Sequence, residues 1–278
     1  MVTSVNTNMA AMIALQNLSA TNRDLLGVQN RINTGLKVAT AKDNAAIFHV
    51  AQNMRSDTSA LNAVKNSMNR ATSIADVAMA AAGSISDLLV RMRETVTAAM
   101  DRSIDAQSRA AYQQDFQALV RQVSSVINNA NFDGANVLNG TITNGIEFLA
   151  DADATQRLTL RTENMSLGGT IITLTAAASI ATSTTATAVL TLVQNSLNNV
   201  NSALARLGAT SKRLEQHTVF ISKLQDTLNS GIGNLVDADL AVESARLNAL
   251  QVKQQLGTQA LSIANQTPQS ILSLFRGG

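Results

Sequence analysis

Apolar residues recur every seven positions along most of the chain, a spacing that places them in one stripe on a helix. The longest run contains Ile47, Met54, Leu61, Met68, Ala75, Ala82, Leu89 and Val96. A companion stripe three residues later, from Val50 to Ala99, has one polar break, at Asp57. At about 1.5 Å per residue, such a helix would be about 80 Å long. A compact globule cannot easily hold it, so the pattern predicts an elongated helical rod.

Two further helices carry the same pattern. A shorter one is predicted by Tyr112, Phe116, Leu119, Val123, Val126 and Ala130, and it ends at the turn-rich residues 131–134. A second long one is predicted by Val193, Val200, Leu207, Leu214, Ile221, Leu228 and Leu235. The two long helices are expected to pack along a common seam. The seam residues that we single out are Leu61, Leu89, Val200, Leu207 and Leu214.

Residues 136–185 have a different character, because glycines punctuate short alternating runs there. Such runs predict hairpin strands at Ile146–Ala150, Arg157–Arg161 and Ile171–Thr175. The following stretch, Ala176–Ala188, is almost entirely Ala, Thr and Ser. It is expected to be an outward-facing loop or the lead-in to the next helix.

Both ends of the chain predict helices with more than one apolar face. Near the start, Leu18, Leu25, Val28 and Ile32 share one stripe, while Ile13, Leu15 and Leu26 form a second. Near the end, the apolar positions are Leu240, Leu247, Leu250, Leu261, Ile271, Leu272, Leu274 and Phe275. A helix that is apolar on two faces needs more than one neighbour.

Composition narrows the function classes. Only 3% of the 278 residues are aromatic and 14% are charged, against about a quarter charged in ordinary soluble domains. Such neutral surface suggests a partner or a polymer. The net charge is +2 without a basic run, which argues against nucleic-acid binding. No uninterrupted apolar stretch approaches the ~20 residues of a membrane helix, so no membrane insertion is expected. With no cysteine, disulfides and thiolate chemistry are excluded.

Candidate catalytic and metal-binding residues are few. His49 and His217 stand beside no second ligand at metal spacing, so ordinary packing or solvation is expected for both. Gly231 and Gly233 predict a hinge or helix break between helices, and Asp151 a solvated hairpin turn. No catalytic, cofactor-binding or metal-binding residue is therefore assigned. Surface hydroxyls open to O-glycosylation, or simply an unmodified polar loop, are expected at Thr182, Ser183, Thr184 and Thr185.

From the residues alone, the chain is a mainly α protein. It is predicted to be a long, coiled-coil-like helical bundle with a small β-hairpin region and terminal helices that lack sufficient partners. Such ends should become ordered by packing against copies of the same chain.

Two long motifs resemble a known family. Residues 31–46 read Arg-Ile-Asn-Thr-Gly-Leu-Lys-Val-Ala-Thr-Ala-Lys-Asp-Asn-Ala-Ala, which resembles the amino-terminal signature of bacterial flagellins. Residues 257–261, 264–266 and 268–276 resemble the carboxyl end of the same family. The resemblance covers essentially everything except about residues 140 to 185.

The resemblance implies a domain organisation. Residues 1–44 and 237–278 would pair as a terminal helical core domain that lines the inner tube of a filament. Residues 45–236 would form a helical rod domain with a β-hairpin and a short variable loop at about 136–185. Assembly would then depend on Leu18, Leu25, Val28, Ile32, Leu247, Leu250, Leu261, Ile271, Leu274 and Phe275.

The resemblance also implies a function and partners. The chain would be a structural subunit, not an enzyme, that self-assembles into the extracellular bacterial flagellar filament used for swimming. It would be exported unfolded by the flagellar type III apparatus, without a cleaved signal. Expected partners are other copies of the chain, a chaperone of the C-terminal helix, the filament cap and hook-junction proteins, and no cofactor is implied.

One segment resembles a receptor-binding motif, and two alternative functions stay open. Arg91, Arg93 and Glu94 match a flagellin segment that an innate-immune Toll-like receptor senses, while Val90, Thr95 and Ala98 depart from it. The rivals are a hook-filament junction protein, which forms a short ring, and a helical signalling coiled-coil module. An enzyme-bearing flagellin is argued against by the absence of His-Glu-x-x-His.

Overall fold

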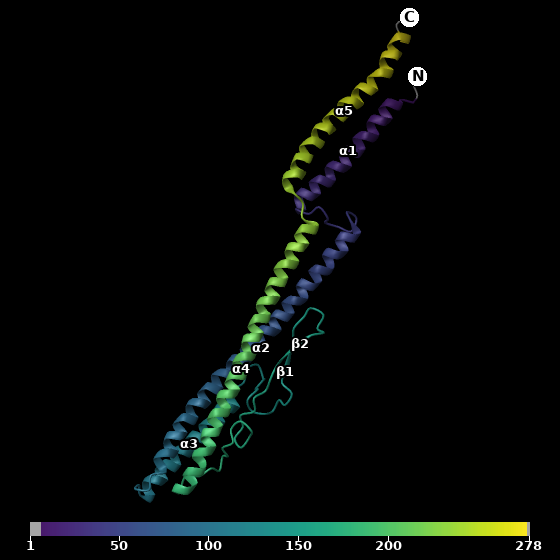
Figure 1. Ribbon diagram of the computed structural model, residues 1–278. Coiled ribbons are helices and arrows are strands. Elements are labelled where there is room, and N and C mark those ends of the chain that lie inside the picture. Colours follow the sequence, from purple (N-terminus) through teal and green to yellow (C-terminus); the bar gives the residue numbers. More distant parts are fainter. Residues whose placement is uncertain (1–6, 277–278) are drawn as a thin grey trace. The chain divides into compact units, whose positions relative to one another are not determined.

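The computed structural model describes the backbone of residues 7–276 and the side chains of residues 7–266. The helices are α1 (Met9–Thr34), α2 (Ala45–Ala99), α3 (Ala106–Asn129), α4 (Ser183–Val236) and α5 (Leu240–Arg276). One antiparallel hairpin consists of β1 (Ile146–Leu149) and β2 (Arg157–Leu160), and Figure 1 shows the order of these elements. The predicted fold class, mainly α with a small hairpin and paired terminal helices, is confirmed.

The chain forms two compact units. We call the described residues up to Ser56, together with those from Thr227 on, the terminal unit, and Asp57–Asp226 the central unit. The division falls within α2 and α4, so each of these helices contributes to both units. The assignment of residues 1–44 and 237–278 to an inner tube stays a prediction.

In the central unit, the predicted seam is the core. Leu61, Leu89, Val200, Leu207 and Leu214 are all buried, with exposed fractions of 2% or less. Small residues of the α2 heptads, such as Ala75 and Ala82, are completely buried and allow close helix packing. Two hydrogen bonds between side chains link α2 to α4 beside the seam. Ser86 Oγ donates to Asn201 Oδ1 at 3.1 Å, and Gln225 Nε2 donates to Asn62 Oδ1 at 2.9 Å.

The buried face of α3 differs from the predicted one. Its buried residues are Phe116, Val120, Val123 and Ile127, whereas the predicted Leu119 and Val126 are only half-buried. Positions 119 and 120 are both apolar, and so are positions 126 and 127. The spacing of apolar residues therefore did not determine which face is buried. Asp105 caps the start of the helix, and its side chain accepts a hydrogen bond from the Ser108 backbone N at 2.6 Å.

The hairpin packs against side chains of α2 and α4. Ser67 Oγ accepts from the Leu149 backbone N at 3.2 Å, and the Arg213 guanidinium donates to the Thr159 carbonyl at 3.2 Å. Strands were expected at Ile146–Ala150 and Arg157–Arg161, and each is present one residue shorter, with Ile146 opposite Leu160. Figure 1 shows this hairpin running beside the long helices.

The prediction of a third strand at Ile171–Thr175 is wrong. The segment is irregular, with Ile172 and Leu174 fully buried. Its backbone is bound by side chains of α4 instead of a strand: Thr173 N donates to Ser196 Oγ at 3.1 Å, and Asn199 Nδ2 donates to the Ile171 carbonyl at 3.2 Å. The lead-in that follows reaches α4 at Ser183, in agreement with the prediction of a helix lead-in.

In the terminal unit, α1 and α5 run side by side (Figure 1). A small apolar cluster in this unit contains Val38, Ala51, Ile232 and Val236. The expected break at Gly231 and Gly233 is wrong, because α4 continues to Val236. A glycine inside a helix costs only about 1 kcal/mol, and a Cβ at Gly231 would lie 3.0 Å from Met54 Cε, so the small residue relieves a close contact.

By length and composition, α2 contains one window apolar enough to cross a membrane. Core helices meet the same criterion. Because the apolar stripe of α2 is packed inside the central unit, this window gives no argument for membrane insertion.

Candidate assembly interface

The inner faces of α1 and α5 hold the terminal unit together. Leu25, Val28 and Leu250 are buried there, and Ile32 and Leu247 pack against them. Leu18 and Leu261 are half-buried, and a Cβ at Gly257 would lie 3.2 Å from Leu18 Cδ1. The structure thus brings five of the predicted residues into one cluster, Leu25, Val28, Ile32, Leu247 and Leu250. The side chains of Ile271, Leu274 and Phe275 lie outside the described residues.

Polar contacts fix the alignment of the two helices along this face. The Gln254 amide donates to Asn22 Oδ1 at 2.8 Å, and Asn8 Nδ2 donates to the Ala264 carbonyl at 2.7 Å. Hydrogen bonds between side chains permit fewer registers than apolar contacts do. The helices are therefore held in one alignment.

An ion pair adds to this alignment. Arg31 Nη1 lies 3.2 Å from Glu243 Oε1, and Glu243 is only 8% exposed. The second carboxylate oxygen of Glu243 has no hydrogen-bond partner within the described chain. A buried carboxylate is expensive unless it is paired, so Arg31 is required by this site.

The outer face of α5 is apolar and uncovered. Val252, Leu256 and Ile263 are 55%, 59% and 66% exposed. Their separations of four and seven residues place them on one face of a helix, and that face is opposite Leu250 and Leu261. These three residues were not among the predicted assembly residues, although their spacing was a sufficient signal.

The outer face of α1 has the same character. Met12, Leu15 and Leu26 are 60%, 55% and 59% exposed, and Met9 and Ile13 are exposed near its start. The second apolar stripe, Ile13, Leu15 and Leu26, was predicted from the sequence, and these three side chains are exposed in the part of the chain that the structure describes. Eleven of the fourteen exposed large apolar side chains in the described residues belong to the terminal unit, so this unit concentrates the available docking surface.

The motif at residues 31–46 forms the connection between α1 and α2. Gly35 ends α1 with a φ of 69°, a left-handed conformation that suits glycine. Lys37 N then donates to the Val236 carbonyl at 2.7 Å, and Ala238 N donates to the Gly35 carbonyl at 2.8 Å. Backbone hydrogen bonds therefore join the α1–α2 connection to the α4–α5 connection.

Asp43 and Asn44 organise the second half of the same motif. The Asp43 carboxylate accepts from the backbone N atoms of Ala39 and Thr40 at 3.1 and 2.9 Å, and Asn44 Oδ1 accepts from Ile47 N at 3.1 Å. The hydrogen bonds from Thr40, first from its backbone and then from its side chain, lower the pKa of Asp43. These residues shape the turn and begin α2, which gives the motif a structural role.

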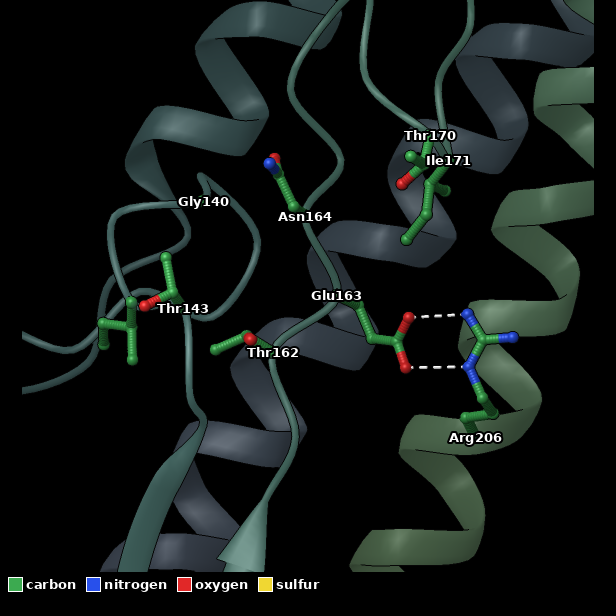
Figure 2. A pocket seen from close by; sticks show the side chains of 9 residues that line it. Gly140, Thr143, Thr162, Glu163, Asn164, Thr170, Ile171 and Arg206 are labelled. Atoms are coloured by element: carbon green, nitrogen blue, oxygen red, sulfur yellow. Dashed lines mark hydrogen bonds and ion pairs between the residues drawn. The ribbon is translucent and has the colours of Figure 1, made fainter.

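The central unit contains an open pocket of about 370 Å³ beside α4. Figure 2 shows Glu163 and Arg206 meeting side by side in it. Arg206 Nε and Nη2 donate to the two Glu163 carboxylate oxygens at 2.8 and 2.6 Å. The Glu163 side chain is 8% exposed and that of Arg206 is 50% exposed. Hydrogen bonding to Glu163 raises the pKa of Arg206, and the charge of this guanidinium is paired with the Glu163 carboxylate.

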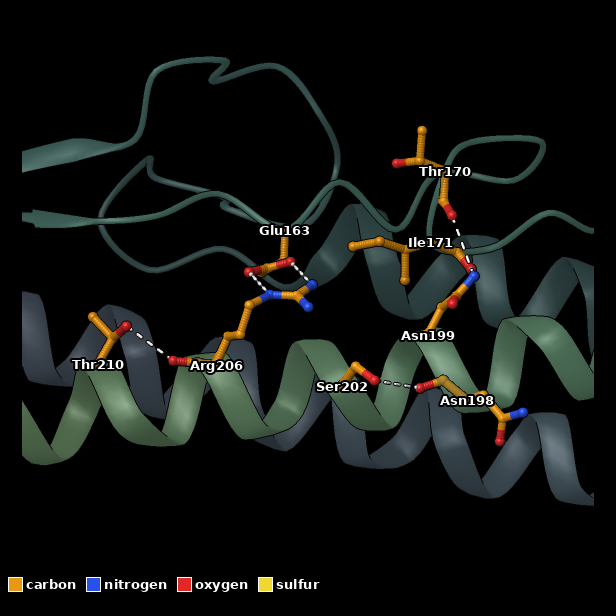
Figure 3. Close-up of polar contacts among 8 residues, drawn as sticks. All are labelled: Glu163, Thr170, Ile171, Asn198, Asn199, Ser202, Arg206 and Thr210. Atoms are coloured by element: carbon orange, nitrogen blue, oxygen red, sulfur yellow. Dashed lines mark hydrogen bonds and ion pairs between the residues drawn. The ribbon is translucent and has the colours of Figure 1, made fainter.

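Polar side chains of α4 near this pocket donate to backbone carbonyls. In Figure 3, Asn199 reaches the carbonyls of Thr170 and Ile171, while Ser202 and Thr210 donate to carbonyls of their own helix. Of these side chains, Asn199 attaches the irregular segment to α4. The arrangement offers no activated nucleophile or acid-base pair.

The other candidate residues also have structural surroundings. His217 Nε2 lies 2.7 Å from the Ala150 carbonyl and its ring centroid lies 5.9 Å from that of Phe220, whereas His49 is exposed. Asp151 accepts from Gln156 N at 3.1 Å, as in a closed turn. Within the described residues, no group of three or more acidic, His or Cys side chains could hold a metal ion.

Two surface predictions stay predictions. Arg91, Arg93 and Glu94 are exposed on α2, which is compatible with receptor contact but does not test it. Thr182 and Thr185 exchange hydrogen bonds at the start of α4, with Thr185 N donating to Thr182 Oγ1 at 3.1 Å. Ser183 is half-buried and Thr184 is exposed, so the stretch is a helix cap as well as a set of surface hydroxyls.

Comparison with known proteins agrees with this arrangement. Residues 5–143 match the bacterial flagellin N-terminal helical region, and residues 190–275 match the C-terminal helical region. The flagellin FljJ of Caulobacter vibrioides is 49% identical over the whole of both chains, and a flagellin of Brucella melitensis is 36% identical over 99% of each.

A solved structure shares the fold. A chain described as a flagellar hook-associated protein from Vibrio parahaemolyticus matches 70% of this chain and all of its own length, with a TM-score of 0.59 and 13% identity. That likeness shows the fold alone. Both family regions and the full-length relatives lead to one conclusion: the chain belongs to the bacterial flagellin family, whose members are the structural subunits of the flagellar filament.

Proposed function

We propose that the terminal unit is the assembly element of this filament subunit, and that the outer faces of α1 and α5 pack against neighbouring copies. The observation that carries the proposal is the uncovered apolar stripe on each helix, Val252, Leu256 and Ile263 on α5 and Met12, Leu15 and Leu26 on α1. The family forms filaments of identical subunits, so the natural occupant of these faces is a second copy of the chain.

The energetics favour this use. Burying a Leu or Ile side chain contributes about 1.5–3 kcal/mol when it is fully exposed beforehand. These side chains are a little over half-exposed, so each would contribute about 1 kcal/mol on assembly. Several such contacts per subunit, repeated along a polymer, stabilise subunit addition substantially.

The inner tube, the route of export and the location belong to the same proposal. Residues 1–44 and 237–278 line the filament core, and the chain works outside the cell after export as an unfolded chain by the flagellar type III apparatus. Before export, a chaperone covers the apolar faces of the C-terminal helix. The cap and the hook-junction proteins are its other partners, and the chain acts as a structural protein without enzyme activity.

Charge placed on the outer face tests the proposal. Leu256→Asp should leave the purified monomer folded, because Leu256 is exposed, but should raise the critical concentration for seeded polymerisation by about 100-fold or more. Gln255→Asp introduces the same charge one residue earlier, away from the stripe, and should polymerise nearly normally. Sedimentation and electron microscopy give the readout.

Two results would contradict the proposal. Filaments of normal length and critical concentration from Leu256→Asp would show that the outer face of α5 does not meet another copy. Short rings that do not elongate on seeds, formed by the unaltered chain, would instead favour a junction protein over a filament subunit.

A further inference from the structure

The central unit contains two Asn-Gly steps, Asn139–Gly140 and Asn144–Gly145, which differ in how the structure holds the asparagine. An asparagine followed by glycine can react with its own backbone. Glycine has no Cβ to shield its nitrogen and has unusual conformational freedom, so this nitrogen can approach the preceding side-chain carbonyl carbon. Whether it does depends on how freely the asparagine side chain moves.

Asn139 is held from several sides. Its Oδ1 accepts hydrogen bonds from Thr141 N at 3.0 Å and from Thr141 Oγ1 at 2.6 Å, and its carbonyl accepts from Ser166 Oγ at 3.0 Å. The Asn164 side chain packs against Gly140, in the loop that Figure 2 shows, so closely that a Cβ there would lie 2.6 Å from it. These contacts hold the Asn139 side chain and the loop in one conformation, and so restrict the rotation that would bring Cγ to the Gly140 nitrogen.

Asn144 lacks the hydrogen bonds that hold Asn139, although Gly145 is also closely packed, since a Cβ there would lie 2.8 Å from the Leu160 carbonyl oxygen. Its side chain is exposed and makes no hydrogen bond within the described part of the chain. Its step lies immediately before β1, with Gly145 at a φ of 82°. The amide is therefore free to rotate toward the next backbone nitrogen.

We infer that Asn144 is a site of spontaneous deamidation and that Asn139 is protected from it. The Gly145 nitrogen, after losing its proton to solvent base, bonds to Asn144 Cγ, and the side-chain amide leaves as ammonia, giving a five-membered succinimide. Water then opens either carbonyl, which yields Asp or isoaspartate at position 144. The inference does not depend on the proposed function, because a single chain suffices for the reaction.

The product changes the surface charge. A neutral amide becomes a carboxylate, so the net charge of each altered chain falls from +2 by one unit. The isoaspartate form also adds one backbone atom immediately before β1. Chains of different age would therefore differ in charge at this loop.

Incubation of the purified chain at mildly alkaline pH tests the inference. One tryptic peptide, residues 122–157, contains both asparagines, and its fragment ions assign the mass gain to either position. Asn144 should react about tenfold faster than Asn139, since the two Oδ1 hydrogen bonds restrict the rotation of the Asn139 side chain that attack requires. In denaturant, where these bonds are absent, the two rates should approach each other.

Variants sharpen the comparison. Thr141→Val removes the Oγ1 donor and should increase the rate of deamidation at Asn139 about threefold, without changing the rate at Asn144. Asn144→Gln should abolish the early charge change on isoelectric focusing. Equal rates at both positions in the folded chain would overturn the inference. So would a folded chain in which Asn144 stays intact while a synthetic peptide of residues 137–149 deamidates.

Discussion

At the scale of single residues, Glu163 is the most buried of the carboxylates that form ion pairs in the described chain, and its partner is Arg206. Arg206→Met should leave a mostly buried carboxylate without its cation and destabilise the central unit by about 3 kcal/mol. Glu163→Gln keeps one acceptor for the guanidinium and should cost about 1 kcal/mol. Urea unfolding followed by circular dichroism measures both changes. Equal losses from the two substitutions would show that burial of Glu163 does not decide the cost.

Asp105 gives a second prediction at this scale, concerning pH. The Ser108 backbone hydrogen bond, and then the Ser108 side chain, lower the pKa of this exposed helix cap. A lowered folded-state pKa means that the stabilisation is present above the ordinary pKa and is lost as pH falls through the folded value. Asp105→Asn keeps a capping oxygen that does not titrate.

The stability difference between the unaltered chain and Asp105→Asn should therefore shrink on acidification from about pH 7 to about pH 3. Thermal unfolding midpoints at matched ionic strength give the measurement. A difference that stays constant across this range would contradict a titrating cap. Asp105→Ala serves as the comparison, since it removes the cap at every pH.

At the scale of elements, α3 distinguishes the observed face from the predicted one. Val120→Ala should cost about 2 kcal/mol, because Val120 is 2% exposed and its removal leaves a cavity. Leu119→Ala removes more atoms but from a half-buried position, and should cost less than about 1 kcal/mol. Denaturation midpoints decide between them, and the reverse order would restore the face that the heptads predicted.

The elements also show what the sequence could and could not reveal. Long heptad runs predicted α2, α4 and their seam, because a seven-residue apolar repeat sustained over many turns is typical of long helices packed against each other. The face of α3 was ambiguous since apolar residues occupy positions 119 and 120 as well as 126 and 127. The strand expected at Ile171–Thr175 failed because Ser196 and Asn199, distant in sequence, bind its backbone.

The candidate interface was predictable in a similar measure. The inner residues Leu25, Val28 and Leu250 follow from apolar spacing, and the structure buries them together. The partner of Glu243, by contrast, lies 212 residues away, and no local pattern identifies Arg31. Contacts of this kind depend on the pairing of α1 with α5, which the family resemblance predicted and the residues alone did not.

At the scale of the whole molecule, the two units should respond differently to protease. The terminal unit has two small inner clusters and broad uncovered apolar faces, whereas the central unit has a long buried seam. Local opening is easiest where few apolar contacts are buried. In the purified monomer, trypsin should therefore cleave first at exposed basic residues of the terminal helices, such as Arg23 and Lys253, and leave residues 57–226 largely intact.

Assembly should reverse this pattern. In filaments, neighbouring copies would cover the outer faces of α1 and α5, and the same two sites should become resistant, as mass spectrometry of the digest would show. Because binding stabilises only the folded form, the protection should increase with the fraction of chain polymerised. Terminal sites that resist trypsin in the monomer as strongly as the seam does would mean that α1 and α5 are stable without partners. The coupling of their order to assembly would then have to be abandoned.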